Sequence, residues 1–233
     1  MNLFKLLRNA VAEDSQSVEQ PALLSPLQRL RQRTGSDQAG FFIDEQAAYA
    51  GAMTLARKWG EQHRRGECGV VVASGGRFDA LIESLTDDFC RVPFNDLAAI
   101  EAAVDSRTVA IVLEPIQGET VITPATTAYV QGVATLCRAL NILLILNEAR
   151  GSVGQNGGLL SEDTYAVSAD IVVLGDYSNR SPRSSALLAR GQACTARIDD
   201  LPGSVPEIAS TRQMRPAASI RVQRQAMPSG LMA

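Results

Sequence analysis

The sequence predicts an α/β domain of three αβα layers, with a mostly parallel β-sheet between two layers of helices. Hydrophobic residues make up 45% of the 233 and charged residues 20%, which is typical of a globular protein. Apolar runs of strand length alternate with segments of helical periodicity in the middle of the chain, a pattern typical of parallel sheets covered by helices. A single core is expected, because cores stop growing only beyond about 250 residues.

Residues 1–40 are expected to form an N-terminal arm that is partly helical. They are rich in Gln, Ser and Arg, and proline and glycine interrupt their short helical stretches over 2–11 and 26–33. A long helix is expected to follow from Asp44, where an acidic pair suits a helix N-terminus, to about Gly66.

The large domain is expected to span residues 41–200. Apolar or β-branched runs predict buried strands there, and apolar residues at helical spacing predict helices. After the long helix, the expected elements are a strand over 69–73, a helix over 96–104, a strand over 108–113, a helix over 126–140, and strands over 142–146 and 171–174. Beyond about residue 200 the pattern dissolves into Pro, Ser, Arg and Gln, which predicts an irregular tail over 201–233.

Polar segments follow three of the predicted strands. They are residues 114–119, 147–150 and 175–178. Ligands of parallel α/β sheets bind at the carboxyl ends of the strands. We therefore expect these segments to share one edge of the sheet and to form the functional site.

The composition argues against several classes of site and partner. A net charge of −3, from 22 basic and 25 acidic residues, gives no attraction to nucleic acid. The one histidine, His63, lies in a polar run that predicts the solvated end of a helix, which argues against His-based triads and metal sites. The four cysteines form no CxxC pair, so we expect reduced, mostly buried thiols and no metal site.

We expect no membrane association and a cytoplasmic location. No apolar run approaches the roughly 20 residues that cross a bilayer. Lys5 and Arg8 interrupt the first apolar residues, and no continuous apolar stretch of an export signal follows.

A series of short motifs runs through the middle of the chain. They are Phe94-Asn95-Asp96-Leu97, Glu114-Pro115-Ile116-Gln117-Gly118-Glu119, Pro124-Ala125-Thr126, Leu143-Leu144-Ile145-Leu146, Val153-Gly154-Gln155-Asn156-Gly157, Asp170-Ile171-Val172-Val173-Leu174-Gly175 and Ala186-Leu187-Leu188-Ala189. With these motifs the chain resembles class III aminotransferases, the pyridoxal-phosphate enzymes that include acetylornithine and succinylornithine aminotransferases. The resemblance implies the large domain of fold-type-I transferases. Because such enzymes are longer, it also implies a truncated chain whose small C-terminal domain is largely absent.

The resemblance places the family's Schiff-base lysine at Asp176, directly after Leu174-Gly175. A carboxylate cannot condense with an aldehyde, and the same lysine normally moves the proton in transamination. Lys58, on the polar end of its helix, and Lys5, in the arm, are no expected substitutes. We therefore assign no catalytic residue, and transamination is not expected.

The positions that the resemblance assigns to the cofactor have also changed. Asn147 replaces the aspartate that pairs with the pyridine nitrogen, and its neutral amide supplies no negative charge. Arg150 replaces a glutamine or histidine near the phenolic oxygen, and its charge could bind an anion. Thr211 matches a threonine that reaches the phosphate in the neighbouring subunit, although it also suits an ordinary tail hydroxyl.

Two further motifs of the cofactor site are also replaced by residues that do not suit the cofactor. Asp44-Glu45-Gln46-Ala47 replaces a Ser-Gly-Ala phosphate cup at a helix N-terminus, and two carboxylates would repel a phosphate dianion. Ser74-Gly75-Gly76-Arg77 replaces an aromatic-His-Gly-Arg turn that stacks on the ring. The family's cofactor is pyridoxal phosphate, but we expect none to be bound here.

One candidate substrate-binding residue remains. Glu119 matches a family glutamate that manages substrate carboxylates, although the residue by itself favours a solvated loop charge. The glycines Gly154 and Gly157 match the turn after the cofactor strand, and they favour an ordinary positive-φ turn.

These residues leave three hypotheses open. The first is a catalytically degenerate binding, scaffold or regulatory partner in amino-acid metabolism, present as a homodimer or as a heteromer with a full-length aminotransferase paralogue. The second is an acetylornithine/succinylornithine-type aminotransferase or another amino-acid-modifying enzyme that binds a zwitterion. Its polar cluster would be Glu119, Asn147, Arg150, Asp176 and Arg183. The third is a truncated gene remnant, which the intact apolar strands disfavour.

Overall fold

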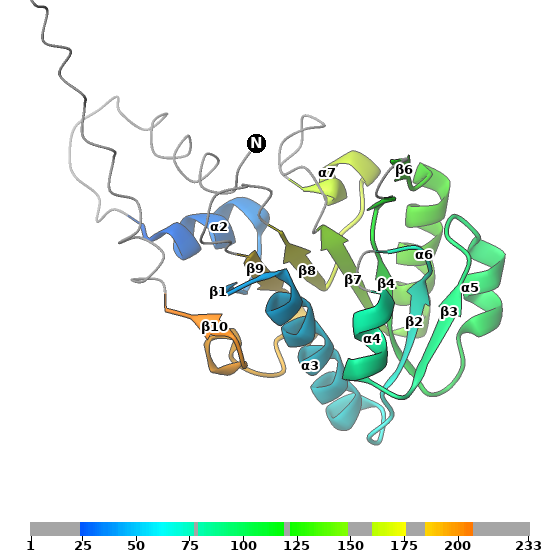
Figure 1. Cartoon of the computed structure of the whole chain (residues 1–233), viewed down its shortest axis with the longest axis horizontal. Helices are drawn as coiled ribbons and strands as arrows, with labels where there is room; N and C mark the ends of the chain where they lie inside the picture. The colour runs from blue at the N-terminus through cyan, green and yellow to red at the C-terminus, as the bar shows by residue number, and fades with distance from the viewer. Residues whose placement is uncertain (1–23, 77–78, 119–121, 149–159, 176–184, 207–233) are drawn as a thin grey trace, which may run out of the picture.

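The fold is built around a mixed sheet of eight strands (Figure 1). The computed structural model describes residues 24–76, 79–118, 122–148, 160–175 and 185–206. The strand order is β10-β1-β9-β8-β7-β4-β2-β3. The strands are β1 (Gln38–Phe42), β2 (Gly69–Ala73), β3 (Phe89–Val92), β4 (Thr108–Leu113), β7 (Leu143–Glu148), β8 (Ile171–Leu174), β9 (Ser185–Ala189) and β10 (Ser204–Val205). The run from β8 to β3 is parallel, whereas β9, β1 and β10 pair antiparallel with their neighbours.

Helices cover both faces of this sheet, which confirms the predicted three-layer architecture. Side chains of β4, β7 and β8 alternate between the two faces, as the two-residue period of a strand requires. One face packs against α3 (Glu45–His63) and α4 (Asp79–Leu85). The other packs against α2 (Pro26–Thr34), α5 (Leu97–Ala103), α6 (Thr127–Leu140) and α7 (Ser161–Tyr165). The remaining elements are the small hairpin of β5 (Ile116–Gln117) and β6 (Thr123–Pro124) and the 3₁₀ turns η1 (Gly191–Ala193) and η2 (Ile198–Asp200).

The longest helix, α3, lies where the sequence predicts it. The carboxylate of Asp44 accepts a hydrogen bond of 2.8 Å from the backbone N–H of Ala47, which caps the helix. Near its other end Trp59 is fully buried. Gly60 lets the chain after the helix fold back closely, because a Cβ there would lie 2.0 Å from the carbonyl oxygen of Glu67. The same Cβ would lie 2.9 Å from Cγ1 of Val109 in β4, so glycine also lets this end of α3 pack closely on the sheet.

The predicted strands and helices of the middle of the chain are confirmed as β2, α5, β4, α6, β7 and β8. Further strands and helices lie in segments for which the sequence predicted none, namely β1, α4, β3, β5, β6, α7 and β9. β10 corrects the expected start of the irregular tail at residue 201, because Ser204 and Val205 pair with β1. The α2 helix of the expected arm packs Leu30, which is 2% exposed, into the core, and β1 crosses the boundary expected at residue 40.

Within the described residues, no helix combines the length and apolar character needed to cross a membrane.

Candidate functional site

The carboxyl ends of β4, β7 and β8 lie next to one another at one edge of the sheet (Figure 1). Leu113 pairs with Leu146, and Asn147 pairs with Val173, so the residues that follow these strands meet there. The strand β1 ends at the same edge, because it runs antiparallel to β9, which runs antiparallel to β8. The structure therefore brings Glu114, Asn147, Gly175 and the N-terminus of α3 to a single carboxyl edge.

Asn147 is buried at this edge, with 2% of its surface exposed. It alternates with Leu143 and Ile145, which belong to the core on the α3 side, so its side chain points toward that face. Its carboxamide is neutral at every ordinary pH. The position that the resemblance gives to a charged aspartate thus holds an uncharged group inside the protein.

The N-terminus of α3 at the carboxyl edge is already occupied by a carboxylate of the chain. Asp44 takes the N–H of Ala47, and Glu45, only 9% exposed, adds a second acidic residue in the first turn. A helix N-terminus attracts phosphate through its free N–H groups and its dipole. Here the capping bond and the acidic residues oppose a phosphate dianion.

The buried polar side chains at the carboxyl edge are acidic or neutral in the part of the chain that the structure describes. They are Glu45, Glu114, Gln117, Asn147, Glu148, Ser161 and Ser185. Ser185 begins β9 beside the end of β8, and its hydroxyl has no hydrogen-bond partner among the described residues. A site of this composition suits neutral or cationic groups better than anionic ones.

Glu148 is the buried residue that sequence reasoning missed. It ends β7 with 1% of its surface exposed, on the face opposite to that of Asn147. Its Oε1 accepts a hydrogen bond of 2.8 Å from the backbone N–H of Ser161. Burial, with the nearby carboxylates of Glu162 and Asp163, raises the pKa of Glu148 to about 8. The sequence places Glu148 two residues after the apolar run 143–146, but no local pattern reveals that it is buried.

Several residues predicted for the site lie outside the described residues. They are Glu119, Arg150, Asp176, Arg183 and Thr211, together with Gly154, Gly157 and Lys5. Of the substituted cofactor positions, the structure therefore describes Asn147, the segment from Asp44 to Ala47, and Ser74 to Gly76. The last of these forms a turn directly after β2, in which the N–H of Ser74 donates to the carbonyl oxygen of Val92 at 2.8 Å and Gly75 has a φ of 89°.

The residues judged unsuited to catalysis lie away from the carboxyl edge. His63 is exposed at the far end of α3, where its ring stacks on Trp59 with centroids 5.1 Å apart. Lys58 belongs to the same end of the helix.

All four cysteines are free, and no group of His, Cys, Asp and Glu among the described residues could hold a metal ion. The expectation of mostly buried thiols is wrong, because Cys137 is buried, whereas Cys68 and Cys194 are half-buried and Cys90 is exposed on the edge strand β3.

The described residues do not fit pyridoxal phosphate, the cofactor that the resemblance implies. The phosphate would meet the Asp44 carboxylate that caps α3, and the pyridine nitrogen would meet the neutral amide of Asn147. Neither interaction provides the charge that the cofactor requires.

Comparison with known sequences finds the same family that the sequence motifs resemble. Residues 78–179 match the family model described as aminotransferase class-III. The chain is 28% identical over 220 residues to acetylornithine aminotransferase 2 of Bordetella pertussis, a match that covers 85% of this chain and 56% of that protein. It is 35% identical over 161 residues to acetylornithine aminotransferase of Neisseria meningitidis serogroup A, covering 62% and 41%. The chain thus spans about half the length of these curated relatives.

Solved structures of similar fold extend the comparison. Ornithine delta-aminotransferase of Plasmodium falciparum superposes with a TM-score of 0.65 at 25% identity, over 84% of this chain and 51% of that one. N-acetylornithine aminotransferase of Stenotrophomonas maltophilia superposes with a TM-score of 0.67 at 22% identity, over 91% and 57%. The sheet and its helices therefore have the fold of the large domain of fold-type-I aminotransferases.

Proposed function

Because the chain belongs to the class III aminotransferase family, we propose that it is a member that binds a ligand or a partner protein without catalysing transamination. The N-terminus of α3 carries this proposal. In place of open N–H groups it presents the Asp44 carboxylate, bonded at 2.8 Å to the N–H of Ala47. A binding site for a phosphate dianion is replaced by a capped and acidic helix end.

Two other positions support the same conclusion. The sequence holds Asp176 where the family's Schiff-base lysine is expected, and a carboxylate forms no imine. Asn147, buried at the end of β7, supplies no charge for a pyridinium nitrogen. The apolar strands behind these residues remain fully buried, so the substitutions are concentrated at the edge and the core is intact.

The ligand or partner belongs to amino-acid metabolism in this proposal. The similar proteins are named as acetylornithine and ornithine aminotransferases. A regulatory or scaffold role would have the chain pair with a second copy of itself or with a full-length aminotransferase paralogue. Native mass spectrometry of the chain alone, and after mixing with the paralogue, tests this pairing. A strictly monomeric chain in both samples would contradict it.

The experiment that tests the loss of chemistry uses pyridoxal phosphate directly. The purified chain is mixed with the aldehyde, reduced with borohydride and digested, and any pyridoxyl-lysine is located by mass spectrometry. Lys58→Gln serves as the control for adventitious reaction. We expect no stoichiometric adduct in either protein.

A stoichiometric adduct on Lys58 or Lys5 would contradict the proposal. It would favour the second candidate, an acetylornithine/succinylornithine-type aminotransferase with a displaced lysine. A trace adduct that is spread over both lysines and is reduced by Lys58→Gln is the surface reaction expected of any exposed amine, and it supports the proposal.

A further inference from the structure

The buried carboxyl group of Glu148 has one satisfied oxygen and one unsatisfied oxygen. Oε1 accepts the N–H of Ser161 at 2.8 Å, whereas Oε2 is inaccessible to solvent and has no hydrogen-bond partner among the described residues. An ionised carboxylate in this position would keep an acceptor without a donor. Burial of such a charge is costly unless it is paired and hydrogen-bonded.

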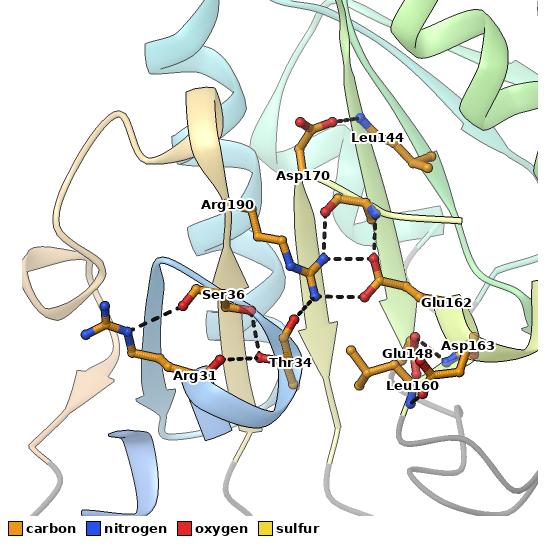
Figure 2. A network of polar contacts seen from close by, with 12 residues as sticks. Arg31, Thr34, Ser36, Leu144, Glu148, Leu160, Glu162, Asp163, Asp170 and Arg190 are labelled. Atoms are coloured by element: carbon orange, nitrogen blue, oxygen red, sulfur yellow. Dashed lines mark hydrogen bonds and ion pairs between the residues drawn. The ribbon is translucent and has the colours of Figure 1, made fainter. Parts of the chain in front are cut away.

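The start of α7 lies against this carboxyl group, and Figure 2 shows Glu148 beside Leu160 and Asp163. The first residue of the helix, Ser161, donates its backbone N–H to Glu148, and Asp163 accepts the N–H of Leu160 at 3.1 Å. With five residues, α7 is too short to be stable alone. Its start is therefore held to the sheet through Glu148.

The remainder of α7 is held by other groups. Glu162 forms a bidentate ion pair with Arg190, and the hydroxyl of Tyr165 donates to the carbonyl oxygen of Ala125 at 3.1 Å. These contacts do not involve Glu148. The start of α7 can thus open while the rest of the helix keeps its ion pair.

The charged groups that act on Glu148 come from α7 and are acidic. They are Glu162, whose charge is balanced by Arg190, and Asp163. Tyr165 is the remaining titratable group of α7, and its phenol is uncharged at neutral pH. An ionised Glu148 would find an ammonium or guanidinium partner in none of these groups.

We propose that Glu148 is a proton-dependent latch for α7: closing the start of the helix onto the sheet takes up one proton, and opening it releases that proton. In the closed form the neutral carboxyl group still accepts the N–H of Ser161. In the open form water solvates the carboxylate. Acidification therefore favours the closed form, at the carboxyl edge where Asn147 is the neighbour of Glu148 in β7.

The pH window of the latch follows from proton linkage. Burial raises the pKa of Glu148 from 4.5 to about 8 in the closed form, and the exposed group returns toward 4.5 in the open form. Between pH 4.5 and about 8, the equilibrium constant for opening rises about tenfold for each pH unit. Above about pH 8 the equilibrium constant no longer changes, because Glu148 is ionised in both forms.

Hydrogen–deuterium exchange of the α7 amides tests the latch. Exchange of the amides of Ser161 to Tyr165 is followed between pH 5.5 and 7.5 in the full chain and corrected for the intrinsic pH dependence. The variants are Glu148→Gln, a neutral isostere, and Glu101→Gln, a control on the exposed face of α5. Amides of α3 provide the internal reference.

We expect the protection of the Ser161 amide in the unmodified chain and in Glu101→Gln to fall about tenfold per pH unit. In Glu148→Gln it is expected to be independent of pH. A flat profile in the unmodified chain, or the same slope in Glu148→Gln, would overturn the latch.

If Glu148→Gln does not fold, carbon-13 NMR of the unmodified chain provides the second test. The Glu148 carboxyl must then titrate well above 4.5. A titration at the ordinary glutamate value would overturn the proposal.

Discussion

Arg190 and Glu162 form a bidentate ion pair, with Nη1 and Oε1 separated by 2.8 Å and Nη2 and Oε2 by the same distance (Figure 2). The side chains are only 16% and 8% exposed. The same guanidinium donates to the carbonyl oxygens of Ala169 at 2.7 Å and Thr34 at 2.9 Å. One side chain thus joins the end of β9, α7 and the end of α2.

Arg190→Ala is expected to lower the free energy of unfolding by about 3–5 kcal/mol, because it leaves the buried charge of Glu162 without a partner. Urea unfolding at neutral pH measures this change. The control is Arg197→Ala, which removes an arginine that is 75% exposed beside Asp199 and Asp200 and is expected to cost about 0–1 kcal/mol. Equal losses in the two variants would mean that the Arg190 pair is as weak as a surface contact.

Ile145→Asp is expected to abolish cooperative folding. Ile145 is fully buried in β7, between β4 and β8, so the substitution places an unpaired charge inside the sheet at a cost of several kcal/mol. Ile122→Asp is the matched control, since Ile122 is 58% exposed and its change is expected to stay within about 0.5 kcal/mol. Thermal unfolding followed by circular dichroism compares them, and an unchanged transition in Ile145→Asp would contradict the assignment of this strand.

The central strands were predictable because their burial on both faces makes them continuous apolar runs. Residues 108–113 and 171–174 carry this signal without help from the rest of the fold. β9 carries no such signal, because its sequence from Ser185 to Ala189 is rich in alanine and leucine, which favour helix. It becomes a strand because β1 and β8 pair with it on either side. Tertiary pairing of this kind is not encoded in a local pattern.

The site, like the strands, was predictable from the sequence only in part. The meeting of Glu114 and Asn147 at one edge follows from parallel strands alone. The burial of Glu148 does not, because it depends on α7, which a sequence pattern of five residues does not reveal. The pairing of Glu162 with Arg190 joins residues 28 positions apart and likewise needs the folded chain.

Glu148 also gives the global stability a predicted pH dependence. Its pKa is raised from 4.5 in the unfolded chain to about 8 in the folded one, so the folded state binds the extra proton between these values. The free energy of unfolding therefore falls as pH rises from about 4.5 to 8, with a contribution from this group of at most about 1.4 kcal/mol per pH unit. Urea unfolding at pH 5, 6.5 and 8 measures the slope.

Glu148→Gln is expected to remove this contribution, so that its stability relative to the unmodified chain increases with pH. Glu101→Gln, at an exposed position, should keep the slope of the unmodified chain. Parallel pH profiles for the unmodified chain and Glu148→Gln would show that this carboxyl group has an ordinary pKa.

Asp176→Lys alone is not expected to restore transamination, because a lysine supplies the amine and leaves the remaining charges of the site unchanged. Asp44 still caps α3 with a carboxylate, and Asn147 still presents a neutral amide. Formation of glutamate from N-acetylornithine and 2-oxoglutarate, in the presence of added pyridoxal phosphate, measures activity, with the unmodified chain as the control. Borohydride reduction of the same sample separates imine formation from turnover. Absence of turnover is the expected result whether or not an imine forms at position 176, since catalysis also requires phosphate and pyridinium charges to be held. Measurable turnover by this single variant would show that the lysine was the one missing component.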